Sequence, residues 1–464
     1  MPHNTAYSTL YTPTIGLLYV FNLIVGTGAL ALPKAFQSAG YAFSILVLLI
    51  SCSASFISAT FVIESLSIGN AVIIRKRKEA QISDSDDVNI NENIHSSFEI
   101  YEKLEVSQMA SMFLGRAGVI FSYFALNVYL FGDLAIYSTT VPKSLMNIIC
   151  TPENTSFTPP SNLCRNNWPS FFDRFTVYRL CVILFILLCV PMIIIGITKT
   201  KYLQLTTTIT RWSAFILMTF LASAQMTTNG IAAIPRAVNV HGFGSLFGVA
   251  VYAFMCHHSL PSLITPMSSK SGVFAKLSCV YLLIIAFYFT LSLTGSFAFA
   301  QIQDVYTLNF LHDDLTSAFY FICDHFLALF PVFTLTTNYP IVGITLVNNM
   351  RVLRDMLMQT NIQLSSEDES LLRSEDDHDQ DLWLRRNTRP FRIKSLFQQI
   401  LLPVLVVVLP TIISLMTDDV LFLTTVTGCY PDKLFLKWQH QIVMNCLIII
   451  FLQVLQYNFS FHAC

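Results

Sequence analysis

Long apolar segments separated by polar loops fill most of the chain. An α-helix needs about 20 mostly apolar residues to cross the hydrocarbon core of a bilayer. Ten segments have about that length, at 15–36, 42–65, 118–141, 178–197, 207–226, 243–265, 277–300, 318–347, 398–416 and 441–459, and a shorter one covers 420–430. We therefore expect an all-α integral membrane protein with about 11 transmembrane helices, of which the tenth is short.

The composition supports a membrane protein. Of the 464 residues, 54% are hydrophobic and 12% are charged, whereas a soluble domain carries about 25% charged residues. The low charge excludes an ordinary soluble enzyme domain. The formal net charge of −1 offers no basic field for nucleic acid. The first apolar segment has no positive leader before it and no small-residue cleavage site after it, so we expect a retained helix.

The distribution of positive charge predicts the orientation of the chain, because lysine and arginine are retained in cytoplasmic loops. If residues 1–14 are cytoplasmic, the loops on the same side hold 19 Lys and Arg residues, at 66–117, 198–212, 266–276 and 348–397. The loops on the opposite side hold four, at 142–177, 227–242 and 301–317. The imbalance predicts a cytoplasmic N-terminus.

The loop 142–177 has two features of an extracellular or lumenal segment. Asn154 begins an Asn-Thr-Ser acceptor sequence, which is glycosylated only on that side of the membrane. Cys150 and Cys164 lie in the same loop, where the oxidising compartment favours a disulfide between them. Two unpaired thiols are the alternative.

The cytoplasmic loops 66–117 and 348–397 contain acidic, serine-rich stretches that are too poor in apolar residues to fold alone. Tyr101–Leu104 matches a tyrosine-based sorting pattern, and Glu367–Leu372 matches an acidic dileucine pattern. These short motifs predict binding of sorting adaptors and an endosomal or lysosomal location. The plasma membrane is the alternative location.

The first apolar segment contains residues that interrupt helices. Gly26 and Gly28 flank Thr27, and Pro33 follows. Glycine inside a helix costs about 1 kcal/mol relative to alanine, and proline about 3 kcal/mol. Backbone groups freed within a membrane require protein or a water-filled cavity as a partner. We expect a break that offers backbone for binding. Close helix packing through small residues is the alternative.

The sixth segment has a similar interruption, in which Cys256, His257 and His258 precede Pro261. Interrupted segments at corresponding places of two halves are typical of transporters with inverted repeats. In such folds half-helix N-termini bind a substrate carboxylate, and exposed carbonyls bind a coupling cation. The predicted halves are 15–226 and 243–430, followed by a last span and the C-terminus at 441–464.

Polar side chains inside the spans are candidates for an ion pathway. The ionisable ones are Asp133, His257, His258, Asp324 and His325. Coupling to protons through one of them is one hypothesis, because histidine titrates near neutrality. Ordinary core packing is the alternative for each histidine. The eighth segment also carries hydroxyl and amide oxygens that suit a monovalent cation, at Thr334, Thr336, Thr337 and Asn338. Their alternative is bonding back to their own helix.

Several of these residues form a known pattern. Phe21-Asn22, Val25-Gly26-Thr27-Gly28 and Leu32-Pro33 resemble the first-helix signature of the amino acid/auxin permease family, within the amino acid–polyamine–organocation superfamily. Phe254, Cys256-His257 and Leu260-Pro261 resemble the sixth-helix pattern of its sodium-coupled neutral amino acid branch.

The resemblance implies a fold like that of the bacterial leucine transporter, with two inverted five-helix repeats. It implies substrate binding at Gly26, Thr27, Gly28, Cys256 and His257, and binding of the coupling ion at Asn22, Thr334 and Thr337. The chain departs from the family after Thr427-Gly428. Pro431-Asp432-Lys433 follows there and leaves about 11 apolar residues, fewer than a span needs.

The sequence therefore predicts a secondary amino acid transporter that works by alternating access and is driven by sodium or protons. No cofactor beyond the coupling ion and no metal site are expected. Two alternatives stay open, a transporter-like sensor or scaffold without turnover and a membrane enzyme that uses His257 or His258 as a base. Nothing in the sequence completes a catalytic site around those histidines, so we do not expect an enzyme.

Overall fold

The computed structural model describes residues 11–84, 98–150, 163–165, 168–169, 171–195, 201–232, 234–311, 318–358 and 393–429. Within these residues no strand forms, and two isolated β-bridges join Tyr11 to Met267 and Leu163 to Asp173. The all-α prediction is confirmed for this part of the chain. The glycosylation sequence at Asn154, the dileucine pattern at Glu367–Leu372 and the last predicted span at 441–459 lie outside the described residues.

Every predicted span within the described residues forms a helix or a pair of short helices. The elements are α1 (Pro13–Ile24), α2 (Thr27–Ala39), α3 (Tyr41–Asp84), α4 (Val106–Phe113), α5 (Arg116–Ile149), α6 (Arg174–Ile195), α7 (Lys201–Asn229), η2 (Val240–Gly242), α8 (Phe243–Phe254), α9 (Leu260–Ile264), α10 (Val273–Ala298), η3 (Tyr306–Phe310), α11 (Ala318–Met358) and α13 (Ile393–Met416). The helix Val420–Cys429 follows α13, and we call it the tenth helix.

Length and apolar composition allow five of these helices to cross a membrane, namely α3, α5, α6, α10 and α11, and the bent pair of α1 and α2 makes a sixth. The tenth helix and the apolar parts of α8 and α13 are shorter. Many large apolar side chains on the outer faces are exposed, and α6 alone exposes Leu184 by 65% and Leu187 by 70%. A bilayer covers such a surface, as expected for a multi-pass membrane protein.

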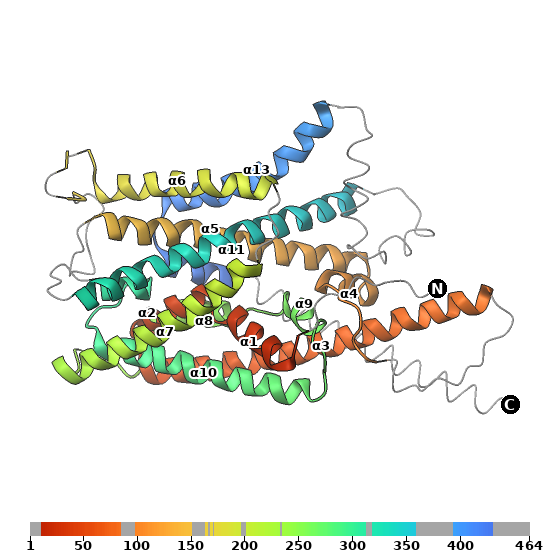
Figure 1. Cartoon of the computed structure of the whole chain (residues 1–464), viewed down its shortest axis with the longest axis horizontal. Coiled ribbons are helices and arrows are strands. Elements are labelled where there is room, and N and C mark those ends of the chain that lie inside the picture. Colours follow the sequence, from red (N-terminus) through yellow and green to blue (C-terminus); the bar gives the residue numbers. More distant parts are fainter. Residues whose placement is uncertain are drawn as a thin grey trace.

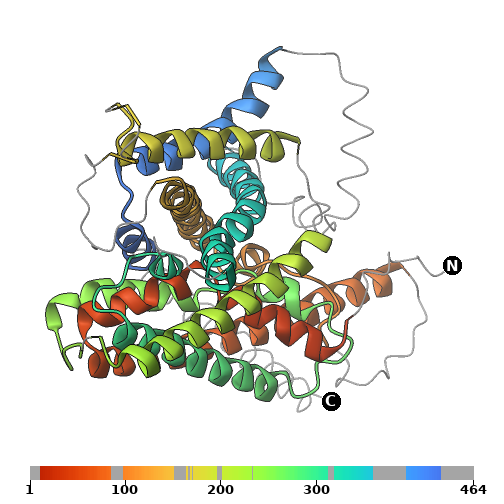
Figure 2. The ribbon, with the colours of Figure 1, turned by 60° about the vertical axis from the view of Figure 1, so that its left-hand side comes forward.

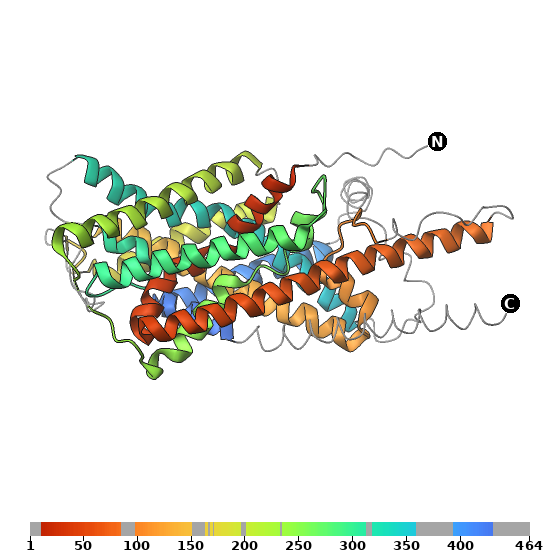
Figure 3. The same cartoon turned by 90° about the horizontal axis from the view of Figure 1, so that it is seen from below.

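The long helices lie roughly along one direction (Figure 1). In Figure 2, α5 and α11 run through the middle of the bundle, with α6 and α13 on one side and α1, α2, α3, α7 and α10 on the other. Figure 3 shows α3 beside α10 and extending well beyond it. The 44 residues of α3 span about 66 Å, about twice the thickness of the hydrocarbon core, so its basic C-terminal turns lie outside that core.

Two helices are broken where the sequence predicted breaks. The axes of α1 and α2 meet at 50° across Val25 and Gly26. The chain leaves helical geometry again between Phe254, the end of α8, and Leu260, the start of α9. Pro33 lies inside α2 without ending it. The break therefore falls at Gly26, which has no side chain to cover the freed backbone groups.

Glycines let the helices around these breaks approach to backbone contact. A Cβ atom added at Gly28 would lie 2.6 Å from the Cα of Ala253, so α2 and α8 touch. A Cβ added at Gly248 would lie 2.4 Å from the carbonyl oxygen of Thr425, and Gly428 faces Gly248 from the tenth helix. The tenth helix is short, but these contacts make it part of the core.

These contacts predict unequal effects of two glycine substitutions one turn apart on α8. Gly248→Ala places a methyl group against the backbone of the tenth helix, and we expect a loss of about 1–3 kcal/mol in the free energy of unfolding. Gly244→Ala is the control, because a Cβ there meets nothing within 4 Å. Thermal unfolding in detergent measures both, and equal unfolding temperatures would contradict the packing.

Candidate functional site

The two broken helices meet at the hydroxyl group of Tyr288 on α10. Its oxygen lies 3.0 Å from the carbonyl oxygen of Ile24 and 2.9 Å from that of Ala253. These carbonyls belong to the last turns of α1 and α8, where the helices offer acceptors without the usual intrahelical donor. One buried side chain thus holds the ends of both half-helices at the same point of the bundle.

Open space lies beside the first break. A Cβ atom added at Gly26 would meet no atom within 4 Å. Gly26 is the N-cap of α2, and the N–H groups of a helical first turn point out of the N-terminus and favour an anion. Of the three residues predicted to bind a substrate carboxylate, Gly26 adjoins open space and Gly28 is packed against Ala253.

Thr27 links the first break to an acidic side chain. Its hydroxyl oxygen lies 2.8 Å from the hydroxyl of Tyr252 on α8, and Tyr252 donates a 2.7 Å hydrogen bond to Oδ1 of Asp133 on α5. Since the single proton of Tyr252 is used there, Thr27 is the donor to Tyr252. All three side chains are buried. The sequence flagged Asp133 but gave no partner for it.

The side chains of the second break bond to neighbouring helices. His257 places Nε2 3.0 Å from the carbonyl oxygen of Ser55 on α3. Cys256 lies 3.4 Å from the hydroxyl of Tyr281 on α10. Ser55 in turn donates to the carbonyl oxygen of Phe254, at the end of α8. These contacts fix the break against α3 and α10, so Cys256 and His257 shape the site while the Cys256 sulfur and the His257 Nε2 atom are engaged by protein.

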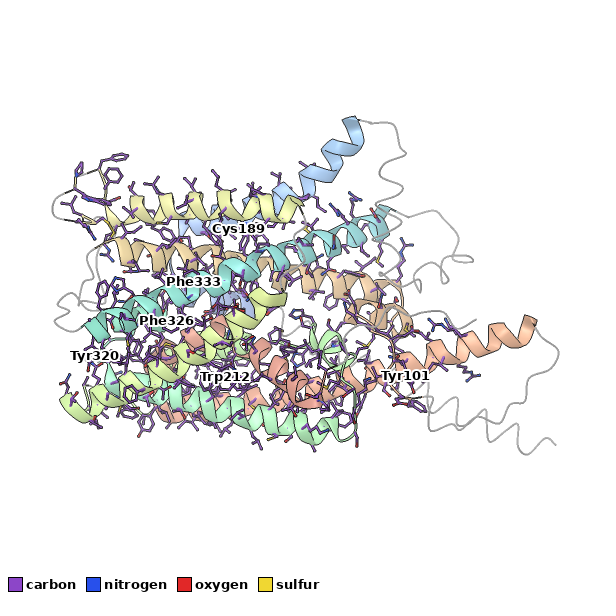
Figure 4. All side chains as sticks on the ribbon, in the orientation of Figure 1. Tyr101, Cys189, Trp212, Tyr320, Phe326 and Phe333 are labelled. Carbon is purple, nitrogen blue, oxygen red and sulfur yellow. A yellow bond between two sulfur atoms is a disulfide. The ribbon has the colours of Figure 1, made fainter. Side chains whose placement is uncertain are left out.

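Asn22, the predicted ligand of a coupling ion, is bound by Arg211 of α7. The guanidinium group donates to the main-chain oxygen of Asn22 and to its Oδ1, the latter at 3.1 Å. Asn22 donates from Nδ2 to Thr208 at 2.8 Å. Next to this contact, Trp212 stacks on Phe21 with ring centroids 4.4 Å apart (Figure 4). In the sequence, Arg211 is only one of the positive charges of the predicted loop 198–212.

The predicted threonine ligands lie on α11. Thr337 donates back to the main-chain oxygen of Thr334 at 2.9 Å, which was the alternative to cation binding. Thr334 is buried, and within the described residues its hydroxyl has no hydrogen-bond partner. The rings of Phe215 on α7 and Phe330 on α11 are 5.7 Å apart.

A fixed positive charge therefore lies where a coupling cation was expected. Both oxygens of Asn22 accept from Arg211, and a sodium ion at the same oxygens would be repelled by the guanidinium group and would have to displace it. The geometry does not favour sodium at Asn22.

Polar contacts also join the helices at the end of the bundle where α2 and α5 terminate. Lys143 of α5 donates to Asp304 and to the main-chain oxygen of Asp418, each at 2.7 Å. Asp304 also accepts from the backbone of Val420, at the start of the tenth helix. Gln37 of α2 donates to the loop that follows α10. We call this set the Lys143 closure.

The chain matches the family model described as "Transmembrane amino acid transporter protein" over residues 11–455. The chain belongs to this family. The match extends past the departure at residue 431 that the sequence showed in the tenth segment. Membership in the amino acid transporter family confirms the relationship that the first-helix residues indicated.

Relatives in animals carry one name. A Caenorhabditis briggsae protein named transmembrane protein 104 homolog is 54% identical over 444 residues, which cover 95% of this chain and 87% of the relative. The Caenorhabditis elegans homolog is 53% identical over 97% of this chain and 89% of its own length. Human transmembrane protein 104 is 41% identical over 75% of this chain and 76% of its own length.

Two further predictions concern loops of this family member. Cys150 and Cys164 form a disulfide in the structure. The sorting pattern Tyr101–Leu104 is folded onto α3, where Asn70 accepts from the backbone of Tyr101 and Glu102 and Arg77 pairs with Glu102.

Tyr101 and Leu104 are presented very differently. Tyr101 is 61% exposed, beside α3 in Figure 4, and the adjacent Glu99 raises the pKa of its hydroxyl. Leu104 is 5% exposed and packs over Gly69. An adaptor that reads both side chains would have to pull Leu104 away from α3.

The contact between Arg211 and Asn22 predicts that sodium does not stabilise the protein specifically. An ion present at about 100 times its Kd would add about 2.7 kcal/mol to the free energy of unfolding. We expect equal unfolding temperatures in sodium, potassium and choline chloride at matched ionic strength. A rise in sodium alone that disappears in Asn22→Ala would show that the ion displaces Arg211.

Proposed function

We propose that this protein is a secondary transporter of amino acids that works by alternating access. The observation that carries the proposal is the meeting of two broken helices at Tyr288 beside the open space at Gly26. An amino acid carries a carboxylate, which suits the N-terminus of α2, and its side chain would lie among the apolar residues of α8 and α10.

The proposed transport cycle uses the halves 15–226 and 243–430 as inverted repeats. Their first helices, α1–α2 and α8–α9, are the ones that break, which supports the assignment. In the structure the Lys143 closure joins α2, α5 and the tenth helix at one end. Access from that end requires these bonds to open, while the tie between Asn22 and Arg211 keeps α1 on α7.

The membrane orientation is part of the proposal. A cytoplasmic N-terminus places the long basic end of α3 in the cytoplasm and the disulfide of Cys150 and Cys164 on the opposite, oxidising side. Glycosylation at Asn154 would occur on the same side as the disulfide. We propose residence in the endosomal or lysosomal membrane, through adaptors at Tyr101–Leu104 or Glu367–Leu372, with the plasma membrane as the alternative.

A sensor that binds amino acids without moving them is the second candidate. The observation that favours it is Arg211, because a built-in cation at Asn22 removes one means of coupling to a gradient. We do not propose an enzyme. His257 and Cys256 bond to α3 and α10, an arrangement that supports anchoring of the second break rather than proton abstraction.

Uptake of a radiolabelled mixture of the common amino acids into proteoliposomes tests the function. We expect gradient-driven uptake by the unaltered protein and loss of uptake in Gly26→Val, because a Cβ atom at this position enters open space, which the valine side chain would fill. Gly115→Val, at an exposed glycine that is equally free of neighbours at the start of α5, is expected to retain uptake.

The outcomes separate the candidates. Uptake that is unchanged in Gly26→Val would contradict the site. If the mixture stabilises the unaltered protein and no uptake occurs under any gradient, the result would contradict the transporter and support the sensor.

A further inference from the structure

Asp133 is a buried carboxyl group near the middle of α5, and it is 5% exposed. Tyr252 donates a hydrogen bond to it, and Tyr129, one turn earlier on α5, also interacts with it. Within the part of the chain that the structure describes, no lysine, arginine or histidine forms an ion pair with it. An ionised carboxylate without a counter-charge is expensive at membrane depth.

The surroundings of Asp133 contain few other groups that change charge. Tyr129 and Tyr137 lie on α5 itself, and Tyr252 reaches it from α8. The ring of His258, within the second break, lies 5.4 Å from that of Tyr129. Arg211 of α7 interacts electrostatically with Tyr137. Asp133 is thus the acid of a site whose other members are mainly hydroxyl groups.

We propose that Asp133 takes up the coupled proton, and that Tyr252 and Thr27 connect its protonation to substrate binding at the first break. The proposal rests on the proposed substrate site at Gly26. It assigns the coupling ion as a proton. This agrees with the guanidinium group of Arg211, which occupies the oxygens of Asn22 where a sodium ion was expected.

The connection follows from counting hydrogen-bond donors. When Asp133 is ionised, Tyr252 must donate to it, and Thr27 then donates to Tyr252. When Asp133 carries a proton, it can donate to Tyr252, and Tyr252 can turn its own proton toward Thr27. The hydroxyl group of Thr27 no longer donates to Tyr252 and can point its O–H bond toward the break, next to the N-terminus of α2.

When these hydrogen bonds run in the reversed direction, the hydroxyl of Thr27 becomes one more donor for a substrate carboxylate. Protonated Asp133 therefore favours a bound amino acid, and a bound amino acid favours protonated Asp133, by the same factor. No covalent bond other than the O–H bond of the carboxyl group forms or breaks. A proton and an amino acid that bind together and leave together constitute symport.

The test compares the unaltered protein with two variants. Asp133→Asn cannot release a proton, and Tyr252→Phe interrupts the hydrogen bonds between Asp133 and Thr27 while keeping Asp133. Stabilisation against heat by the amino acid mixture, measured across pH, reports binding without requiring transport. For the unaltered protein we expect the apparent affinity to rise at least about 5-fold toward acid pH. Both variants should lose this dependence. Asp324→Asn, which alters a different buried carboxyl group on α11, should keep it.

A second readout follows Asp133 itself. The infrared spectrum of the protein in lipid should show a carboxylic-acid carbonyl band that changes with pH. This band should be missing in Asp133→Asn and present in Tyr252→Phe and Asp324→Asn. Its presence in Tyr252→Phe shows that this variant is folded and that Asp133 still titrates. A loss of the pH dependence of binding in this variant is then due to the interrupted hydrogen-bond chain.

Transport gives the third comparison. Asp133→Asn should lose accumulation driven by a pH gradient while still exchanging internal for external amino acids. Binding whose pH dependence survives in Asp133→Asn, or a band that survives in it, would overturn the proposal. If the unaltered protein moves no amino acid, the transport function fails, and pH-dependent binding that is lost in Asp133→Asn would still support proton coupling at this residue.

Discussion

The structure depends on one constraint, that every backbone group freed inside a membrane must find a partner. Breaking α1 and α8 exposes carbonyl groups at the ends of both, and the hydroxyl of Tyr288 lies within hydrogen-bond distance of those of Ile24 and Ala253. Its single proton is shared between them, and the carbonyl of Ile24 also accepts from the N–H group of Gly26. Glycines make it geometrically feasible. Gly28 lets α2 touch α8, and Gly248 lets the tenth helix touch α8, so the breaks are enclosed by protein on these sides and remain open beside Gly26.

Two buried ionisable side chains hold the two halves of the broken first helix. Arg211 holds the last part of α1 through Asn22, and Asp133 reaches the first turn of α2 through Tyr252 and Thr27. The halves of the broken first helix are thus tied to ionisable groups on different helices, α7 and α5.

Features that depend on local sequence were predictable. Apolar length predicted the positions of the helices, the glycines at 26 and 28 predicted the first break, and shared loop position predicted the disulfide of Cys150 and Cys164. Pro33 was a weaker guide, because α2 accommodates it. Pro33 lacks an N–H group, and it lies in the second turn of that helix, where the neighbouring helices pack closely.

Features that depend on distant contacts were not predictable. Arg211 is separated from Asn22 by 189 residues, and Tyr252 from Asp133 by 119. No local pattern pairs them, since only packing of α1 on α7 and of α8 beside α5 brings them together. For the same reason no local pattern indicated that Leu104 is buried while the tyrosine of the same sorting pattern is exposed.

We propose that the two breaks form one binding site. Hydrogen–deuterium exchange of the full chain in lipid, with and without the amino acid mixture, is the measurement that decides this. We expect the mixture to slow exchange at the amides of residues 26–28 and also at those of residues 255–259, the two breaks that meet at Tyr288. Protection confined to another region, or no protection at either break while the mixture stabilises the protein, would contradict it.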